Sequence, residues 1–332
     1  MKAAYIEETG PPEVIQFGEV AEPVVGPTQV LVDVTRVSVN PIDTYIRNGA
    51  NFWELPRPFV VGCDLAGRVS EVGSSVTRFR VGDRVWGSNQ GLLGRQGTFA
   101  ERAAVDESWL YPSPDGVPDE DLAAIALVGI TAHIGLFKCA GLTPGETVIV
   151  NGGSGSVGST VVQMAKAVGA RVIATAGGAE HCEQTRQYGA DVAVDYRADD
   201  ATEQLRAAVD GGAAVYWETV REPDFDRILG LLADGGRIVL MAGRDARPPF
   251  PVGPFYVKGC SLHGFAMFKE APQTQRRSAE DIARWLESGR LKAHIGQRME
   301  LHEAAAAHRL QEDNTLRKAG TLCGKIVLRV QD

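Results

Sequence analysis

The stretch 148–158, Val-Ile-Val-Asn-Gly-Gly-Ser-Gly-Ser-Val-Gly, constrains the fold more than any other part of the chain. A short β-rich run leads into Gly152, Gly155 and Gly158, and an amphipathic helical pattern follows and ends at Gly169. Glycines at this spacing let backbone N–H groups approach a pyrophosphate, and the start of the helix adds partial positive charge. Because the strand and the helix are both present, the motif predicts a dinucleotide-binding βαβ unit; a purely structural turn is the alternative.

The end of the second predicted strand indicates which dinucleotide would bind. Residues 171–175 run into Ala176-Gly177-Gly178 without an Asp or Glu at the tip, where an acid would hold the ribose hydroxyls of NAD. His181 follows closely, and Tyr196 and Arg197 end the third predicted strand. A missing acid beside cationic and aromatic groups favours a 2′-phosphate, and therefore NADPH. The alternative is that His181 and Arg197 are ordinary solvated surface residues.

A length of 332 residues suggests two domains. The pattern of strand-like and helix-like segments also changes twice along the chain. Up to about residue 120, short apolar strands are separated by glycine-containing turns, which is typical of a barrel-like β unit. A change of phase among alternating valines predicts a β-bulge near Thr35-Arg36. From about 122 to 264, strand patterns alternate with helical ones, which predicts a doubly wound parallel sheet.

The last part of the chain returns to mixed structure. Ser278 is expected to cap the start of an amphipathic helix that ends at Gly289. A further helix is expected over about 302–312, and the run of β-branched and apolar residues over 325–330 predicts a closing strand.

Charge and cysteine usage argue against several classes of protein. The net charge is −8, from 34 basic and 42 acidic residues, and no basic run is present, so a nucleic-acid partner is not expected. The five cysteines are scattered without a CxxC pair, which favours a reducing, cytoplasmic compartment. The N-terminus has no signal-peptide pattern. The longest apolar stretch, 122–137, is shorter than about 18 residues and contains His133, so a buried helix and no membrane association are expected.

Five further motifs are spread along the chain. They lie at 40–49 (NPIDTYIRNG), 58–69 (PFVVGCDLAGRV), 81–85 (VGDRV), 97–101 (GTFAE) and 324–328 (GKIVL). With the glycine motif, they make essentially the whole chain resemble the medium-chain dehydrogenases/reductases, and among these it is similar to the zinc-independent, zeta-crystallin-like NADPH:quinone oxidoreductases.

The resemblance implies an α/β fold, with a GroES-like β-rich catalytic domain (1–121 and 265–332) plus an inserted Rossmann doubly wound parallel sheet domain (122–264). Cofactor and substrate would meet in the cleft between the domains.

The resemblance also allows a test for zinc. Zinc-dependent relatives carry Cys where this chain has Asn40, and His-Glu where it has Cys63-Asp64, and the third ligand position falls near Leu127. One Cys without His or Cys partners cannot close a zinc site. The hydroxyl of the alcohol proton relay is replaced by Ile42. No metal is therefore expected, and Cys63 is interpreted as a small buried residue.

Site residues follow from the same resemblance. Tyr45 and Asn40 would lie beside the nicotinamide and the substrate as the catalytic pair. Tyr45 would either donate a hydrogen bond or a proton to the oxygen that gains charge, or only line the pocket. The implied cofactor-binding residues are Thr131, Gly155, Ser156, Val157, Gly158, Gly177, Gly178, His181, Tyr196, Gly243, Arg244, Phe265, Ala266 and Met267.

Two positions depart from the family pattern. The family usually has Lys where this chain has His181, so phosphate affinity is expected to depend on pH. The family also tends to show Asp-x-Val-Gly after the fourth strand of the Rossmann domain, whereas residues 217–221 read Trp-Glu-Thr-Val-Arg and contain no glycine. This puts the local approach of the backbone to the cofactor in doubt.

The expected function is NADPH-dependent, zinc-independent reduction of quinones, an activity that geometry alone can promote because quinones are already electrophilic. Two alternatives remain: an NADPH-dependent reductase of α,β-unsaturated carbonyls, and a non-catalytic NADPH-binding protein. The resemblance also suggests a homodimer, formed through residues 260–264 if these make an edge strand; they could equally form an internal strand.

Overall fold

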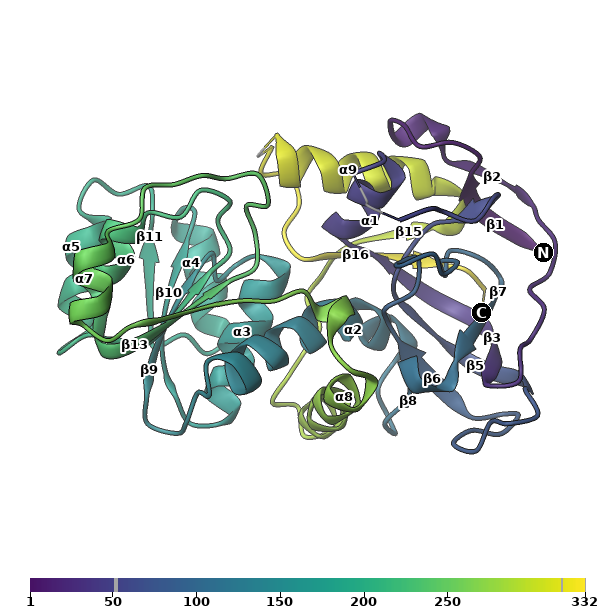
Figure 1. Cartoon of the computed structure of the whole chain (residues 1–332), viewed down its shortest axis with the longest axis horizontal. Helices are drawn as coiled ribbons and strands as arrows, with labels where there is room; N and C mark the ends of the chain where they lie inside the picture. The colour runs from purple at the N-terminus through teal and green to yellow at the C-terminus, as the bar shows by residue number, and fades with distance from the viewer. Residues whose placement is uncertain (51–52, 318, 332) are drawn as a thin grey trace. The chain divides into compact units, whose positions relative to one another are not determined.

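The computed structural model describes residues 1–50, 53–317 and 319–331. The chain divides into two compact units, each assembled from separate segments (Figure 1). The β-rich unit takes in Met1–Leu127, Ala271–Glu287 and Ala293–Asp332, and the α/β unit takes in Val128–Glu270 and Ser288–Lys292. The sequence led us to expect domain boundaries at 121–122 and 264–265, and these boundaries stay a prediction.

In the described part of the α/β unit, six strands form one parallel sheet in the order β11-β10-β9-β12-β13-β14. Counted along the chain, this is the order 3-2-1-4-5-6 of a doubly wound dinucleotide-binding sheet, as predicted. β14 lies at one end of this order, so it is an edge strand. The bounds are β9 (Thr147–Asn151), β10 (Arg171–Ala176), β11 (Val192–Asp195), β12 (Ala213–Glu218), β13 (Leu232–Leu240) and β14 (Ser261–Gly264).

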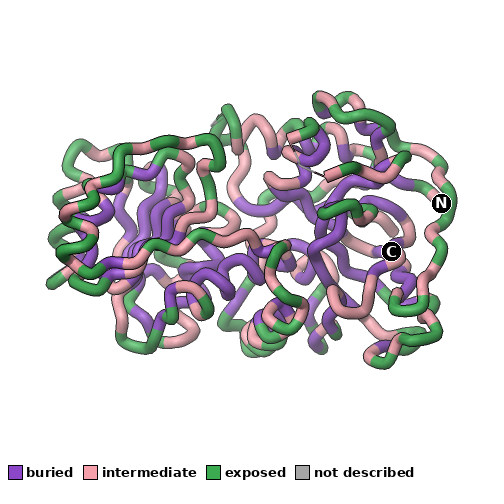
Figure 2. Tube along the Cα trace, in the orientation of Figure 1, coloured by how far each residue is buried: buried purple, intermediate pink, exposed green. Residues whose placement is uncertain are grey.

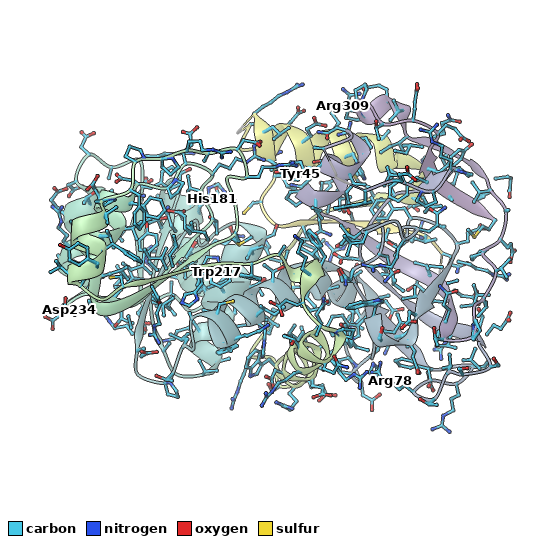
Figure 3. The ribbon with its side chains drawn as sticks, in the orientation of Figure 1. Tyr45, Arg78, His181, Trp217, Asp234 and Arg309 are labelled. Carbon is cyan, nitrogen blue, oxygen red and sulfur yellow. The ribbon has the colours of Figure 1, made fainter. Side chains whose placement is uncertain are left out.

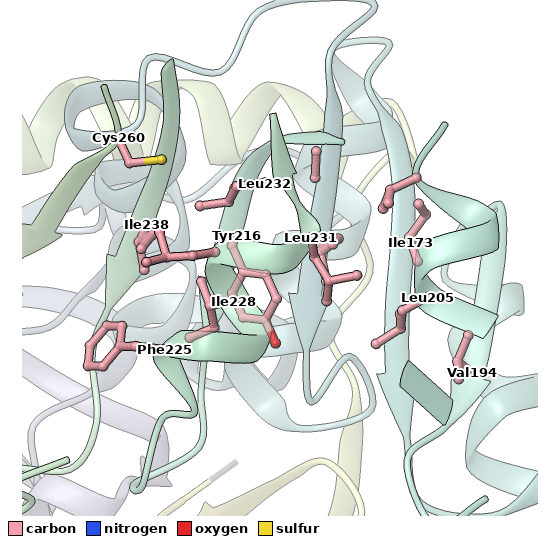
Figure 4. Packing of buried hydrophobic residues seen from close by; sticks show 14 residues of the cluster. Ile173, Val194, Leu205, Tyr216, Phe225, Ile228, Leu231, Leu232, Ile238 and Cys260 are labelled. Carbon is pink, nitrogen blue, oxygen red and sulfur yellow. The ribbon is translucent and has the colours of Figure 1, made fainter. Parts of the chain in front are cut away.

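Helices cover both faces of this sheet. On one face, Ile173 and Tyr216 are buried against Leu205, Phe225 and Ile228 from the covering helices (Figure 4). Each such apolar side chain contributes about 1.5–3 kcal/mol when fully buried. The buried residues of the unit gather along the strands (Figure 2). The first face is covered by α5 (Ala201–Ala208), α6 (Phe225–Leu231) and α7 (Val252–Val257), and the other by α3 (Ser156–Ala167) and α4 (Ala179–Gln187).

A long apolar helix packs against the sheet close to Trp217. α2 (Asp119–His133) continues into a π-helical turn, η3 (Ile134–Cys139). Together, residues 119–139 are long and apolar enough to cross a membrane by length and composition. The apolar stretch expected from the sequence, 122–137, was too short for this. Most of it is nevertheless buried inside the fold, as in a core helix. A Cβ at Gly135 would lie 2.3 Å from the Trp217 ring, so only glycine lets the helix approach this strand.

Two sheets build the described part of the β-rich unit. One has the order β2-β1-β4, and the other the order β15-β16-β3-β5-β6-β8, with β7 also paired to β3. The pairing of β3 with β5 shifts register between Val34 and Arg36, which confirms the expected bulge. The strands are β1 (Lys2–Ile6), β2 (Gln16–Glu19), β3 (Gln29–Val39), β4 (Phe59–Val60), β5 (Leu65–Val72), β6 (Arg84–Gly87), β7 (Arg102–Asp106), β8 (Leu110–Pro112), β15 (Ile295–Glu300) and β16 (Lys325–Arg329).

The helices of the β-rich unit correct one expectation. Its described residues include α1 (Pro41–Arg47), α8 (Pro272–Glu287) and α9 (Ala304–Leu316), together with the first part of α2. Ser278 was expected to cap a helix, but α8 begins at Pro272, and the buried Ser278 hydroxyl donates to the carbonyl of Thr274 at 3.2 Å inside the helix. The first turns of α8 bury Gln275 in place of an apolar side chain, so the hydrophobic pattern begins too late to reveal them.

Candidate functional site

The glycine loop and the helix after it form an anion-binding turn. A Cβ at Gly152, where φ is +88°, would lie 2.3 Å from Thr219 Oγ1, and a Cβ at Gly158 would lie 2.0 Å from Gly152 O. Glycine is therefore required at both positions. α3 begins at Ser156 with Gly155 as its N-cap, so the predicted Ser156, Val157 and Gly158 form its first turn, where backbone N–H groups point out of the end of the helix. This cradle, at the positive end of a helix dipole, fits a pyrophosphate.

A second cluster forms where β10 and β11 end. A Cβ at Gly177 would lie 2.6 Å from the Tyr196 hydroxyl and 3.2 Å from Arg197 Nη2. On α4, His181 Nδ1 lies 2.9 Å from Gly177 O, so this nitrogen donates to the carbonyl (Figure 3). The structure thus brings the predicted Gly177, Gly178, His181 and Tyr196 together with Arg197, the other cationic residue that the sequence indicated.

Asp195 fixes the shape of this cluster. Its Oδ1 accepts hydrogen bonds from the backbone N–H groups of Gly178 (2.9 Å) and Arg197 (3.0 Å). These bonds hold the pKa of Asp195 below its usual value. Arg197 also stacks near the Tyr196 ring, with its guanidinium carbon 5.8 Å from the centroid. A permanently charged guanidinium held over two glycines is a group that recognises phosphate.

The other predicted cofactor residues lie elsewhere in the α/β unit. Gly243 follows β13 with φ +82°, and a Cβ there would lie 2.1 Å from Arg221 O, so glycine is required. The neighbouring Arg244 is exposed and lies 3.8 Å from the Asp245 carboxylate. Thr131 is buried in α2. Phe265, Ala266 and Met267 follow the edge strand β14, and Met267 is buried in η4 (Met267–Lys269).

The predicted catalytic residues belong to α1 in the β-rich unit, where Asn40 is the N-cap and Tyr45 lies in the second half of the helix. Tyr45 is partly exposed on this helix (Figure 3). Asn40 is fully buried: its Oδ1 accepts from Lys325 Nζ at 2.5 Å and its Nδ2 donates to Asp64 Oδ2 at 2.7 Å. Both ends of this amide are therefore engaged by the protein itself. The catalytic roles of Tyr45 and Asn40 stay predictions.

Sequence reasoning missed the charged cluster around Asn40. Burial raises the pKa of Asp43 to about 7 and raises the pKa of Asp64, while it lowers the pKa of Lys325. Asp43 Oδ2 accepts from the Asn40 N–H at 2.7 Å, which starts α1. Lys325 Nζ donates to Val39 O at 2.8 Å and lies 3.9 Å from Asp64 Oδ2. The available signal was Lys325, a lysine directly before the apolar residues 326–328 of the closing strand.

The donor set near Asn40 does not fit a zinc ion. Across residues 1–50, 53–317 and 319–331, no group of three or more His, Cys, Asp or Glu side chains is arranged to hold a metal. Burial, together with the carboxylates of Asp43 and Asp64, raises the pKa of the Cys63 thiol well above its usual value. This opposes the thiolate form that binds zinc.

Comparisons with known proteins extend these observations. The family model "Alcohol dehydrogenase GroES-like domain" matches residues 26–115, and "Zinc-binding dehydrogenase" matches residues 156–286. A quinone oxidoreductase of Sus scrofa is 32% identical, with 99% of this chain and 97% of that protein covered. The structure of an NAD-dependent alcohol dehydrogenase has a TM-score of 0.88 at 30% identity, with both chains fully covered. A mycobacterial protein solved in complex with NADPH has a TM-score of 0.84 at 30% identity, with 99% and 100% covered. The expected combination of a GroES-like domain with a Rossmann sheet is thereby confirmed.

Proposed function

This chain belongs to the quinone oxidoreductase family, and from that premise we propose that it reduces quinones with NADPH and without a metal ion. The observation that carries the proposal is the cluster at the ends of β10 and β11. There Arg197, His181 and Tyr196 surround two glycines, and no acid stands at the tip of β10. This cluster suits the 2′-phosphate that distinguishes NADPH from NADH. The relative that was solved with NADPH adds support.

The residues of the α/β unit would hold the cofactor at both of its phosphate groups. The first N–H groups of α3 would bind the pyrophosphate, and Arg197 and His181 would bind the 2′-phosphate. When bound, the nicotinamide supplies the hydride. The Tyr45 hydroxyl would donate a hydrogen bond or a proton to the substrate oxygen that gains charge. Asn40 would act through its bonds to Lys325 and Asp64, which fix the start of the helix that carries Tyr45.

The deciding experiment is NADPH oxidation with a planar ortho-quinone in the presence of a metal chelator. Turnover that survives the chelator and falls at least about tenfold with NADH supports the proposal. Parallel assays offer an α,β-unsaturated ketone with NADPH, and a primary alcohol with NAD⁺. Faster turnover of the ketone would assign enone reduction. Chelator-sensitive alcohol oxidation would contradict the metal-free proposal, and NADPH binding without any turnover would indicate the non-catalytic alternative.

We also propose a cytoplasmic location and a homodimer. The five cysteines are all free, in agreement with a reducing compartment. The open edge of β14 supports pairing with a second copy. Fractionation of the native cells and the mass of the purified protein in solution test these two proposals.

A further inference from the structure

Three buried polar side chains form a row at the carboxyl edge of the parallel sheet. Asn151, Thr175 and Glu218 lie at or next to the ends of β9, β10 and β12, and each is at most 4% exposed. Each lies two residues beyond a member of the hydrophobic cluster in Figure 4, so all three share that face of the sheet. A hydrophobic row is thus followed by a polar row, at the edge where parallel sheets bind ligands.

The hydrogen bonds along this row all run in one direction. The Gly152 N–H donates to Thr175 Oγ1 at 3.0 Å, and the Thr175 hydroxyl donates to Asn151 Oδ1 at 2.7 Å. Asn151 Nδ2 then donates to Oε1 and Oε2 of Glu218, at 2.8 and 3.0 Å. A hydroxyl has one hydrogen, and an amide has distinct donor and acceptor ends, so each bond fixes the orientation of the next group. Glu218, which accepts the last bond, therefore fixes the orientation of the Asn151 amide and of the Thr175 hydroxyl. As a result, Thr175 Oγ1 is left as an acceptor for the Gly152 N–H.

The segment after β12 holds the same loop from a second side. The Val220 N–H donates to Glu218 Oε1 at 2.7 Å, and the Thr219 hydroxyl donates to Asn151 O at 2.6 Å. Thr219 Oγ1 also occupies the space that a Cβ of Gly152 would fill. This is the segment that lacks the glycine of the family pattern. The Thr219 side chain of this segment contacts the start of the glycine loop directly.

The charge of Glu218 is costly to bury, which argues that it serves a purpose other than stability. Burial raises the pKa of Glu218 to about 7, while the Val220 N–H, the Asn151 amide and the positive charge of Arg227 on α6 oppose this shift. Tyr216 lies two residues before Glu218 on β12, on the same face of the sheet, and its pKa is raised by burial and by the Glu218 carboxylate. An apolar side chain would fill the site without the cost of desolvating a carboxylate, but it could not orient Asn151.

We propose that Glu218 is a positioning residue for the cofactor. Through Asn151 and Thr175 it holds Gly152, the first glycine of the loop, in the conformation that receives the pyrophosphate before NADPH arrives. A loop that is ordered in advance loses less conformational entropy on binding, so this arrangement raises affinity without a direct contact. The proposal rests on the NADPH binding proposed above.

The test compares the full-length wild type with E218Q at pH 8, above the pKa of Glu218. The substitution keeps the shape of the side chain and leaves Oε1 as an acceptor for the Val220 N–H. It removes the negative charge and replaces Oε2, which lies 3.0 Å from Asn151 Nδ2, with an NH₂ group, so that at this position two donors face each other. NADPH affinity, measured by fluorescence titration, is expected to fall about tenfold or more, as when a hydrogen bond to a charged group is lost. In the protein without cofactor, the Gly152 amide is expected to exchange its hydrogen faster.

A rescue variant separates orientation from general damage. The double variant N151D/E218Q places the carboxylate at position 151 and the amide at position 218, so that donors face acceptors along the whole row again. It is expected to restore NADPH affinity to within about threefold of wild type, since no hydrogen-bonding position is left unpaired. The matched control is E146Q, which changes a carboxylate before the start of β9, where Glu146 binds Arg237. It is expected to leave the NADPH affinity unchanged.

Each outcome decides the proposal. Wild-type affinity with wild-type exchange at Gly152 in E218Q overturns it, and so does a double variant that binds no better than E218Q. If wild type itself binds no NADPH, the proposed function fails, and Gly152 exchange still decides the role of Glu218. If E218Q does not fold, T175V cuts the same row at its middle link while T175S keeps the hydroxyl; equal affinity of these two variants overturns the proposal.

Discussion

At the scale of single residues, His308 is a histidine that its surroundings keep uncharged. It is fully buried on α9, its ring meets Phe99 edge to face, and no hydrogen-bond partner for either ring nitrogen is present among the described residues. Burial, together with the nearby charge of Arg47, lowers its pKa to about 3. The unfolded chain therefore takes up a proton near pH 6.5, before the folded protein does, so stability falls as the pH drops from about 6.5 toward 3.

A substitution at His308 tests this acid sensitivity. Between pH 6.5 and 4.5 the free energy of unfolding of H308L is expected to fall by about 2–3 kcal/mol less than that of the wild type, because leucine takes up no proton in either state. Urea unfolding at several pH values measures the difference. H302L, at an exposed position, serves as the control and should keep the wild-type slope. Parallel pH profiles for H308L and wild type would contradict the prediction.

Arg197 is expected to carry most of the recognition of the 2′-phosphate. Its guanidinium lies over Gly177 and Gly178, whereas Nδ1 of the neighbouring His181 is already engaged by Gly177 O. NADPH affinity should therefore fall about tenfold in R197A. Titration of the wild type and the variant against NADPH measures this, and an unchanged affinity in R197A contradicts the role of Arg197.

At the scale of elements, replacing a glycine with alanine should change the free energy of unfolding in opposite directions in two helices. A Cβ at Gly135 in η3 would overlap the Trp217 ring, so G135A is expected to destabilise by about 1–3 kcal/mol. Gly230 lies exposed in α6 with no atom within 4 Å of a built Cβ, so G230A is expected to stabilise by about 0.5–1 kcal/mol. Urea unfolding of both variants measures the two signs. Destabilisation by G230A would show that helix propensity does not control that site.

The same contrast explains which elements the sequence could reveal. α3 was predictable because glycines mark its start and an apolar stripe marks its buried face. The first turns of α8 were not, because their buried residue is Gln275, a polar side chain that a hydrophobic pattern does not register. A strand at 260–264 was suggested by the family resemblance, with an edge and an internal position both open. Its place at the edge required the sheet order, which depends on contacts between segments far apart in the chain.

At the scale of the whole molecule, the fold was largely predictable and the polar networks were not. The glycine motif and the alternation of strands with helices limit the α/β unit to a doubly wound sheet. In contrast, Asn151 and Glu218 are 67 residues apart, and Lys325 and Asn40 are 285 apart, yet each pair is hydrogen-bonded. Neither pair is marked by local spacing. The Trp217–Arg221 departure pointed to the right segment, but not to the carboxylate that engages the glycine loop.

The last prediction concerns the proposed homodimer. Among the residues that the structure describes, no strand pairs with the outer side of β14. Nearby, Val252, Tyr256 and Val257 on α7 and Leu262 on β14 are 41–74% exposed. An open edge beside exposed apolar side chains favours pairing with a second copy about a two-fold axis. Light scattering after gel filtration should give twice the chain mass of 35.6 kDa for wild type, and the single mass for V257K/L262K. V24K, at a 90% exposed valine of the β-rich unit, should remain dimeric, since a lysine there lies on no proposed interface. A monomeric wild type would contradict the proposed dimer. A double variant that stays dimeric would show that the dimer forms through another surface.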